Sequence, residues 1–274
     1  MNFTFRQLRL FLALAETGSV SAAAKAMHVT QPTASMQLKE ISASVGLPLY
    51  EVIGKKVFLT DVGKSLAVTA RDITQSLASF EQLTYATKGI AKGHLRIAVV
   101  STAKYFMPRL IGSFCKRHPL IDVSLEILNR DGVLGRLRQN TDDLYIMSMP
   151  PDDVVLMDEV LMPNPIVVIA ASTDPLTKQK KVSLDDLSRR RFILRESGSG
   201  TRMAADQHFR KKKFRPDIRL ELGSNEAVKE SVAGGLGIGV ISQYALHGHQ
   251  KEHGVRVIDV NDFPLKSSWH LVHL

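Results

Sequence analysis

The 274-residue sequence has little cysteine and no long apolar run. A single cysteine, Cys115, cannot form a disulfide within the chain, which fits a reducing compartment. No apolar run reaches the roughly 18 residues that a helix needs to cross a bilayer. The opening stretch MNFTFRQLRLFLALAETGS is interrupted by Arg9, Glu16 and Gly18, unlike a signal peptide. These features predict a cytoplasmic protein with no membrane partner.

Signatures of catalysis are also lacking. The sequence contains no Gly-x-Ser-x-Gly nucleophile turn, and ESGSGTR (196–202) does not supply one with a partnered acid and base. The histidines do not show the spacing of metal ligands. We therefore expect a protein that is not an enzyme, with no catalytic residues, no metal site and no cofactor.

The charge balance is strongly basic. The formal net charge is +9 and the isoelectric point is about 9.7. Such a surface favours an anionic partner, which can be nucleic acid, an acidic membrane surface or a small anion. At roughly 100–200 residues per domain, the length predicts two or three folded units.

Helical patterns fill the first fifty residues. Leu8, Phe11 and Leu12 repeat with helical spacing up to Gly18, and a second short helix follows. A third helix is predicted after the N-cap Thr30. Two helices joined by a short turn behind a supporting helix are typical of a helix-turn-helix, although a plain three-helix bundle has the same pattern.

The second helix of such a motif enters the DNA major groove with its N-terminal residues first. Short and amide side chains there can approach base edges without burying a charge, and Gln can pair with adenine. The next segment, LPLYEVIGKKVFLTDVG (47–63), reads as a hairpin whose lysines reach phosphates. The predicted contacts to double-stranded DNA are Gln31, Pro32, Thr33, Ser35, Met36, Gln37, Lys39, Lys55 and Lys56.

A long helix is predicted between residues 63 and 88, with a seam of positions alternately four and three apart that are apolar up to Phe80. This spacing indicates a coiled coil of about three heptads with a second subunit, although a helix packed on its own domain is the simpler alternative. The segment KGIAKG (88–93) is predicted to be a hinge. The seam consists of Leu66, Ala70, Ile73, Leu77, Phe80 and Thr84.

From His94 onward, strand and helix patterns alternate, which predicts α/β layers with largely parallel sheets. The order strand, polar tip, helix occurs at VSTAKY (100–105) and again at ESGSGTR. Two lobes with these tips would face one crevice, where helix N-termini favour an anion. The predicted effector contacts are Ser101, Thr102, Lys104, Asn129, Ser148, Ser199, Thr201, Arg202 and Asn225.

The segment SVSAAAKAMHVTQPTASMQLKEISASVGLPLYEVIGKKVFLTDVG resembles the winged helix-turn-helix of the LysR-type transcriptional regulators. The spacings of Ala-Ala, Gln-Pro, Ser35 and Leu-Thr…Gly are specific to that family. Met36 and Val52 stand where most members have arginine, and Lys39, Lys55 and Lys56 can compensate for the lost charge. Met36 and several segments of the second half resemble the CbbR branch, which regulates Calvin-cycle (RuBisCO) operons.

The resemblance implies three parts. Residues 1–62 would form the DNA-binding domain, 63–92 a dimerisation helix and hinge, and 93–274 a two-lobed effector domain like a periplasmic binding protein, with its second lobe at about 166–246. It further implies a homodimer or homotetramer. The expected effector is a small anion such as a sugar phosphate or NADPH. Members normally continue beyond KSSWHLVHL with another helix, which we expect to be missing here.

Two other functions fit the same observations. One is a regulator of the same type that controls another metabolic operon. The other is a two-lobed protein that binds a small anion without catalysis.

Overall fold

The computed structural model describes residues 2–54, 56–87, 92–246 and 254–274. Lys55, residues 88–91 of the predicted hinge, and three of the histidines therefore lie outside the described residues. The contacts divide the chain into two units, Met1–Lys92 and Gly93–Leu274. We call the first unit the head and describe each unit by itself.

The head begins with three helices, as its local signals predict. Thr4 and Gln7 form a reciprocal capping box at the start of the first helix, and Gly18 ends it in the left-handed conformation at φ +62°. The Thr30 side chain accepts a hydrogen bond from the Thr33 N–H at the start of the third. The helices are α1 (Phe5–Thr17), α2 (Val20–Ala26) and α3 (Gln31–Val45).

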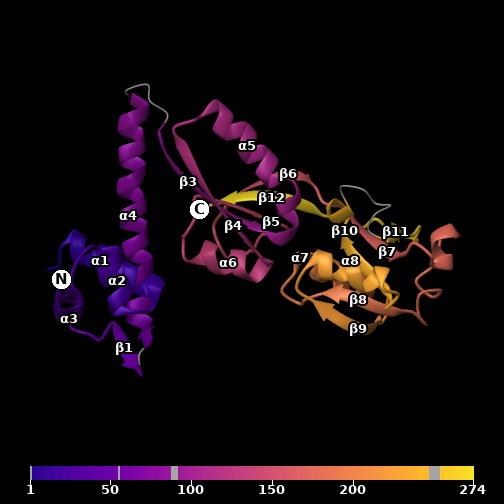
Figure 1. Ribbon diagram of the computed structural model, residues 1–274, viewed down its shortest axis with the longest axis horizontal. Coiled ribbons are helices and arrows are strands. Elements are labelled where there is room, and N and C mark those ends of the chain that lie inside the picture. Colours follow the sequence, from indigo (N-terminus) through magenta and orange to yellow (C-terminus); the bar gives the residue numbers. More distant parts are fainter. Residues whose placement is uncertain (1, 55, 88–91, 247–253) are drawn as a thin grey trace. The chain divides into compact units, whose positions relative to one another are not determined.

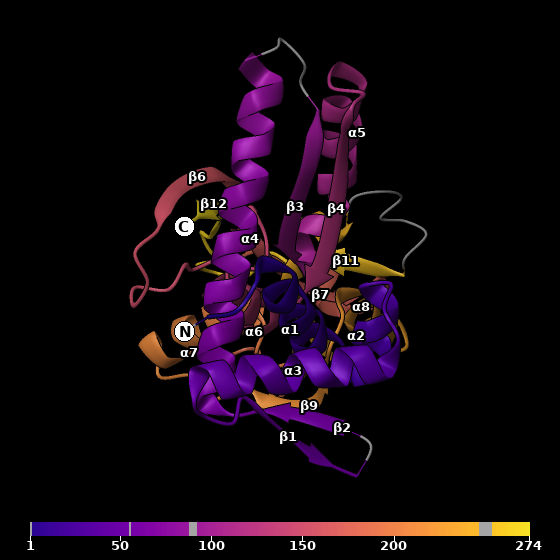
Figure 2. The same cartoon turned by 90° about the vertical axis from the view of Figure 1, so that its left-hand side faces the viewer.

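The core of the head holds the apolar faces of these helices. Phe11, Leu14, Ala23 and Leu38 are fully buried or nearly so. The small side chain of Ala23 lets α2 pack closely on its neighbours. Figure 2 shows α3 running across the head, with the antiparallel hairpin of β1 (Tyr50–Ile53) and β2 (Lys56–Leu59) beside it.

The long helix α4 (Asp61–Thr87) starts inside the head and extends beyond its other helices (Figure 1). Ala67 and Ala70 are buried against the head core. Further along α4, apolar side chains of the predicted seam are exposed to between 44% and 61%, namely Ile73, Leu77 and Phe80. The first half of the helix therefore packs on its own unit, whereas the second half presents an uncovered apolar face.

The second unit contains two lobes, each built on a five-stranded sheet in the described residues. The first sheet has the order β4-β3-β5-β12-β6, and α5 and α6 pack on it. The bounds in this lobe are β3 (Gly93–Val100), the short helix η1 (Ser101–Tyr105), α5 (Met107–Arg117), β4 (Ile121–Leu128), α6 (Arg130–Arg138), β5 (Leu144–Met147), β6 (Met157–Pro163) and β12 (Ser268–His273).

The second sheet has the order β11-β7-β10-β8-β9, and α7 and α8 pack on it. Its core includes Ile169, Phe192 and Val240. The bounds in this lobe are β7 (Ile166–Ala171), η2 (Pro175–Lys178), β8 (Arg191–Arg195), α7 (Gly200–Lys211), β9 (Asp217–Leu222), α8 (Asn225–Ala233), β10 (Ile238–Ser242), η3 (Gln243–Leu246) and β11 (Val255–Val257).

The prediction of largely parallel sheets is wrong. Among the described strands, each sheet has two parallel and two antiparallel pairings. The antiparallel pairings arise because the chain passes between the lobes twice. After β11 it returns to the first lobe, and β12 inserts between β5 and β6 (Figure 1). Sequence patterns predicted no strand at β6, β11 or β12. β11 has only three residues, β6 is mostly exposed, and the buried positions of β12 do not alternate regularly with accessible ones.

No helix in the described ranges is long and apolar enough to cross a membrane. Within the same residues, no group of three His, Cys, Asp or Glu side chains is placed to hold a metal ion.

Candidate functional site

A small cavity between the two lobes of the second unit collects polar side chains from both. We call it the crevice. The first lobe contributes the residues that follow β3 and β5 and the start of α6, and the second lobe contributes the start of α7. Its lining consists of Val100, Ser101, Thr102, Asn129, Arg130, Ser148, Ser199, Gly200 and Thr201.

Six of the nine predicted effector contacts line the crevice, namely Ser101, Thr102, Asn129, Ser148, Ser199 and Thr201. These residues come together because strands of each sheet end at this edge and the next turn or helix begins there. Several are buried, including Thr102, Ser148, Ser199 and Thr201 at 4–5% exposure. Polar groups at such depth need hydrogen-bond partners, so the crevice is suited to a polar ligand.

The other three predicted contacts lie elsewhere. Lys104 forms an ion pair with Glu226 at 2.9 Å, and Asn225 begins α8 and is buried. Arg202 pairs with Asp206 and Glu221 at 2.9 and 2.7 Å. Carboxylates of α7 and β9 therefore hold the Arg202 guanidinium, and its charge is already compensated.

Arg130, the cation of the crevice lining, is not among the residues predicted from the sequence. Its Nε and Nη2 donate to the Met149 carbonyl oxygen at 3.1 and 2.6 Å. No ion pair joins Arg130 to a carboxylate within the described residues. Burial lowers the pKa of Arg130, and the neighbouring charge of Asp131 opposes that shift. An arginine still remains charged at neutral pH, so the crevice contains a partly desolvated cation.

The lobes touch closely around this cation. A Cβ on Gly200 would lie 2.2 Å from Ser148 Oγ, and a Cβ on Gly198 would lie 2.6 Å from Asp131 Oδ2. The free volume of the crevice is about 10 Å³, roughly the space that one water molecule needs. A larger ligand must therefore part the lobes from the arrangement seen here.

The outer face of α3 carries the predicted DNA contacts. Ala34 and Leu38 are buried, so the intervening positions point outward. Gln31, Pro32, Met36 and Lys39 are exposed, while Thr33, Ser35 and Gln37 are half-buried. The Thr33 hydroxyl lies 2.8 Å from the Thr30 hydroxyl. On the hairpin, Lys56 is exposed at the start of β2. Polar side chains and lysines therefore share an accessible surface of the head.

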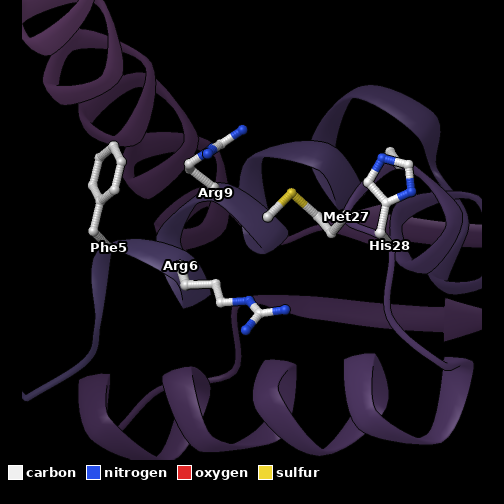
Figure 3. A pocket seen from close by; sticks show the side chains of 6 residues that line it. Phe5, Arg6, Arg9, Met27 and His28 are labelled. Atoms are coloured by element: carbon white, nitrogen blue, oxygen red, sulfur yellow. The ribbon is translucent and has the colours of Figure 1, made fainter.

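The head also has a hollow that the sequence analysis did not predict. It lies between the start of α1 and the end of α2 and has a volume of about 380 Å³. Figure 3 shows Phe5, Arg6 and Arg9 on one side and Met27 and His28 on the other. Arg6 and Arg9 give this hollow positive charge, and His28 lies two residues before the N-cap of α3.

Both units match known protein families. Residues 5–64 match the bacterial regulatory helix-turn-helix protein, lysR family, and residues 88–274 match the LysR substrate binding domain.

Similar proteins cover nearly the whole chain. The HTH-type transcriptional activator CmpR of Synechocystis sp. (strain ATCC 27184 / PCC 6803 / Kazusa) is 41% identical over 272 residues, which is 99% of this chain and 90% of the relative. A RuBisCO operon transcriptional regulator of Acidithiobacillus ferrooxidans is 42% identical over 270 residues, 98% and 87% respectively.

A solved structure is similar to the second unit. The regulatory domain of CcmR from Synechocystis PCC6803, in complex with 2-PG, is 42% identical and has a TM-score of 0.65. The similarity covers 67% of this chain and 88% of that one.

Proposed function

The chain belongs to the LysR family of bacterial transcriptional regulators, and we propose that it controls genes of CO₂ fixation in response to a small phosphorylated acid bound in the crevice. It is a DNA-binding transcriptional regulator, and the relatives reported above are named as regulators rather than enzymes. The alternative of a two-lobed protein that binds a small anion without catalysis is set aside, because residues 5–64 match the family helix-turn-helix.

The target genes are inferred from whole-chain similarity. A relative that is 42% identical along 98% of this chain is named for the RuBisCO operon. Met36, which most family members replace with arginine, also fits the CbbR branch. A regulator of another metabolic operon is the alternative, and a genome-wide footprint of bound DNA decides between them.

The effector is inferred from the chemistry of the crevice. Arg130, the Asn129 amide and several hydroxyls of both lobes line it. A related regulatory domain was solved in complex with 2-PG, which we interpret as 2-phosphoglycolate. Charge-assisted hydrogen bonds to phosphate or carboxylate oxygens are among the strongest available to such groups. We favour a small phosphorylated acid over a sugar phosphate or NADPH, because every one of these ligands must part the lobes and the smallest requires the least separation. The single observation that carries this proposal is the Arg130 guanidinium in the lining, which no carboxylate of the described residues pairs with.

The outer half of α4 bears on how the chain assembles. The exposed apolar side chains Ile73, Leu77 and Phe80 on the outer half of α4 support pairing with a second copy of the chain. A homodimer or homotetramer would place its heads on half-sites spaced by whole helical turns of double-stranded DNA. A protein that reads chromosomal DNA in a bacterium works in the cytoplasm.

Regulation requires that the effector distinguish between arrangements of the lobes. An anion that binds one arrangement more tightly shifts the population towards it, whereas equal affinity for both shifts nothing. We propose that this bias reaches the heads through residues 88–93. The test is a gel-shift titration of promoter DNA from CO₂-fixation genes with and without 2-phosphoglycolate. The expected result is sequence-specific binding whose affinity or footprint changes with the ligand. An absence of sequence preference at moderate salt would exclude the proposal.

A further inference from the structure

Two crevice hydroxyls accept hydrogen bonds from buried groups behind them. The Oγ of Ser101 accepts one from Nη2 of Arg195 at 3.2 Å. The Oγ1 of Thr102 accepts one from Nε1 of Trp269, also at 3.2 Å. Arg195 is 1% exposed and Trp269 is fully buried, and neither lines the crevice itself. The two donors come from β8 and β12, which belong to different lobes.

The direction of these bonds is fixed by chemistry. A guanidinium group and an indole N–H are donors and offer no acceptor. The hydroxyl protons of Ser101 and Thr102 therefore cannot point back at Arg195 or Trp269. Both hydroxyls line the crevice, so each is free to donate its proton to a ligand there.

Asn129 is oriented by a similar arrangement. Its Oδ1 accepts the N–H of Gly132 at 2.9 Å as the cap of α6. That bond fixes the amide, and its Nδ2 lies on the side of Gly198 in the second lobe, 3.2 Å from the position of a Cβ there. The amide thus presents its donor, and the neighbouring Arg130 is itself a donor without acceptor capacity.

We infer that Arg195 and Trp269 are positioning residues that fix the crevice hydroxyls as donors and so select fully ionised oxyanions. This inference rests on the proposed function, because it concerns the same crevice. A phosphate or carboxylate oxygen accepts from all of these groups, whereas a ligand that presents its own N–H or O–H there sets a donor against donors, and its proton finds no acceptor. A polar site rejects such a ligand because unpaired buried donors are costly.

Trp269→Phe isolates the indole N–H. In the unaltered chain the ring centroids of Trp269 and Phe106 are 4.7 Å apart. The change keeps an aromatic ring beside Phe106 and removes the donor to Thr102. Calorimetric titration of the full chain with 2-phosphoglycolate is the measurement. Loss of the positioning bond should weaken binding roughly fivefold, as expected for one hydrogen bond.

A double-mutant cycle separates positioning from packing. In a Thr102→Val background the same Trp269→Phe change should leave the Kd unaltered, because its target hydroxyl is gone. Arg195→Lys measured with and without Ser101→Ala repeats the test at the second hydroxyl, with the charge retained. The matched control is Tyr145→Phe, which removes a buried hydroxyl bonded to Asp142 and Arg136 in the same lobe. It should lower the Tm without changing the Kd.

The outcomes distinguish the two proposals. The inference would be overturned if Trp269→Phe raised the Kd equally with and without the Thr102 hydroxyl. It would also be overturned if the unaltered chain bound 2-phosphoglycolate and Trp269→Phe left that Kd unchanged. If the unaltered chain binds neither 2-phosphoglycolate nor inorganic phosphate, the proposed crevice function fails first.

Discussion

Tyr105 of the first lobe donates its phenolic proton to Glu226 of the second lobe, with an Oη–Oε1 distance of 2.6 Å. Lys104 donates to the other carboxylate oxygen at 2.9 Å. Tyr105 also packs against the core of the second lobe, and Tyr244 of that lobe packs against the core of the first. A carboxylate with two donors thus links the lobes beside reciprocal aromatic contacts.

This link predicts a pH dependence. Burial alone would raise the pKa of Glu226, but the hydrogen bonds from Tyr105 and Lys104 outweigh it and lower the pKa to about 2. A carboxyl whose pKa is lowered on folding stabilises the fold above its ordinary value of 4.5, and this contribution is lost as the pH falls towards 2. In thermal unfolding between these pH values, the Tm difference between the unaltered chain and Glu226→Gln should shrink with decreasing pH. A difference that stays constant would contradict the assignment.

Gly63 predicts a steric requirement in the head. A Cβ at this position would lie 1.9 Å from the Leu49 carbonyl oxygen, which is backbone and cannot rotate away. Gly63→Ala should therefore destabilise the chain by roughly 3 kcal/mol, at the upper end for overpacking. The matched control is Gly112→Ala on α5, where a Cβ meets nothing within 4 Å and helix propensity favours alanine. Chemical denaturation that found both changes equally mild would refute this packing.

The outer face of α3 predicts a division of labour between base and phosphate contacts. Gln31→Ala or Ser35→Ala should relax base preference by about 1–3 kcal/mol, the value of a good base contact. Lys56→Ala should instead weaken all sequences alike and reduce the salt slope by about 1. Binding to matched and scrambled sites over a salt series measures both. If the Lys56 variant alone lost sequence preference, the assignment of base contacts to α3 and phosphate contacts to the hairpin would be wrong.

Local signals made the head predictable from sequence. The caps at Thr30 and Gly18 and the apolar spacing depend on neighbours within a few residues, so the helices follow from the chain itself. The return of β12 to the first lobe does not follow from local signals, because it brings Trp269 to Thr102, which lies 167 residues earlier in the sequence. The sequence also places Arg202 beside the polar tip ESGSGTR as a candidate ligand contact. In the fold it pairs instead with Glu221 of β9.

Arg130 illustrates the same limit within the crevice. It follows the N-cap Asn129 and has no sequence feature that separates it from other helical arginines. Only the closure of the two lobes places it beside Ser199 and Thr201. The polar tips were visible in the sequence because a strand ends at each of them, and the strand–tip–helix order was the usable signal.

The most direct test of the central claim is the affinity of the full chain for 2-phosphoglycolate, measured by titration calorimetry for Arg130→Gln and Arg138→Gln. Both arginines lie on α6, but Arg138 pairs with Asp153 and does not line the crevice. Arg130→Gln should weaken binding by roughly tenfold or more, because hydrogen bonds to charged groups contribute about 1.5–3 kcal/mol. Arg138→Gln should leave the affinity nearly unchanged. Equal affinities for both variants and the unaltered chain would show that the effector binds outside the crevice.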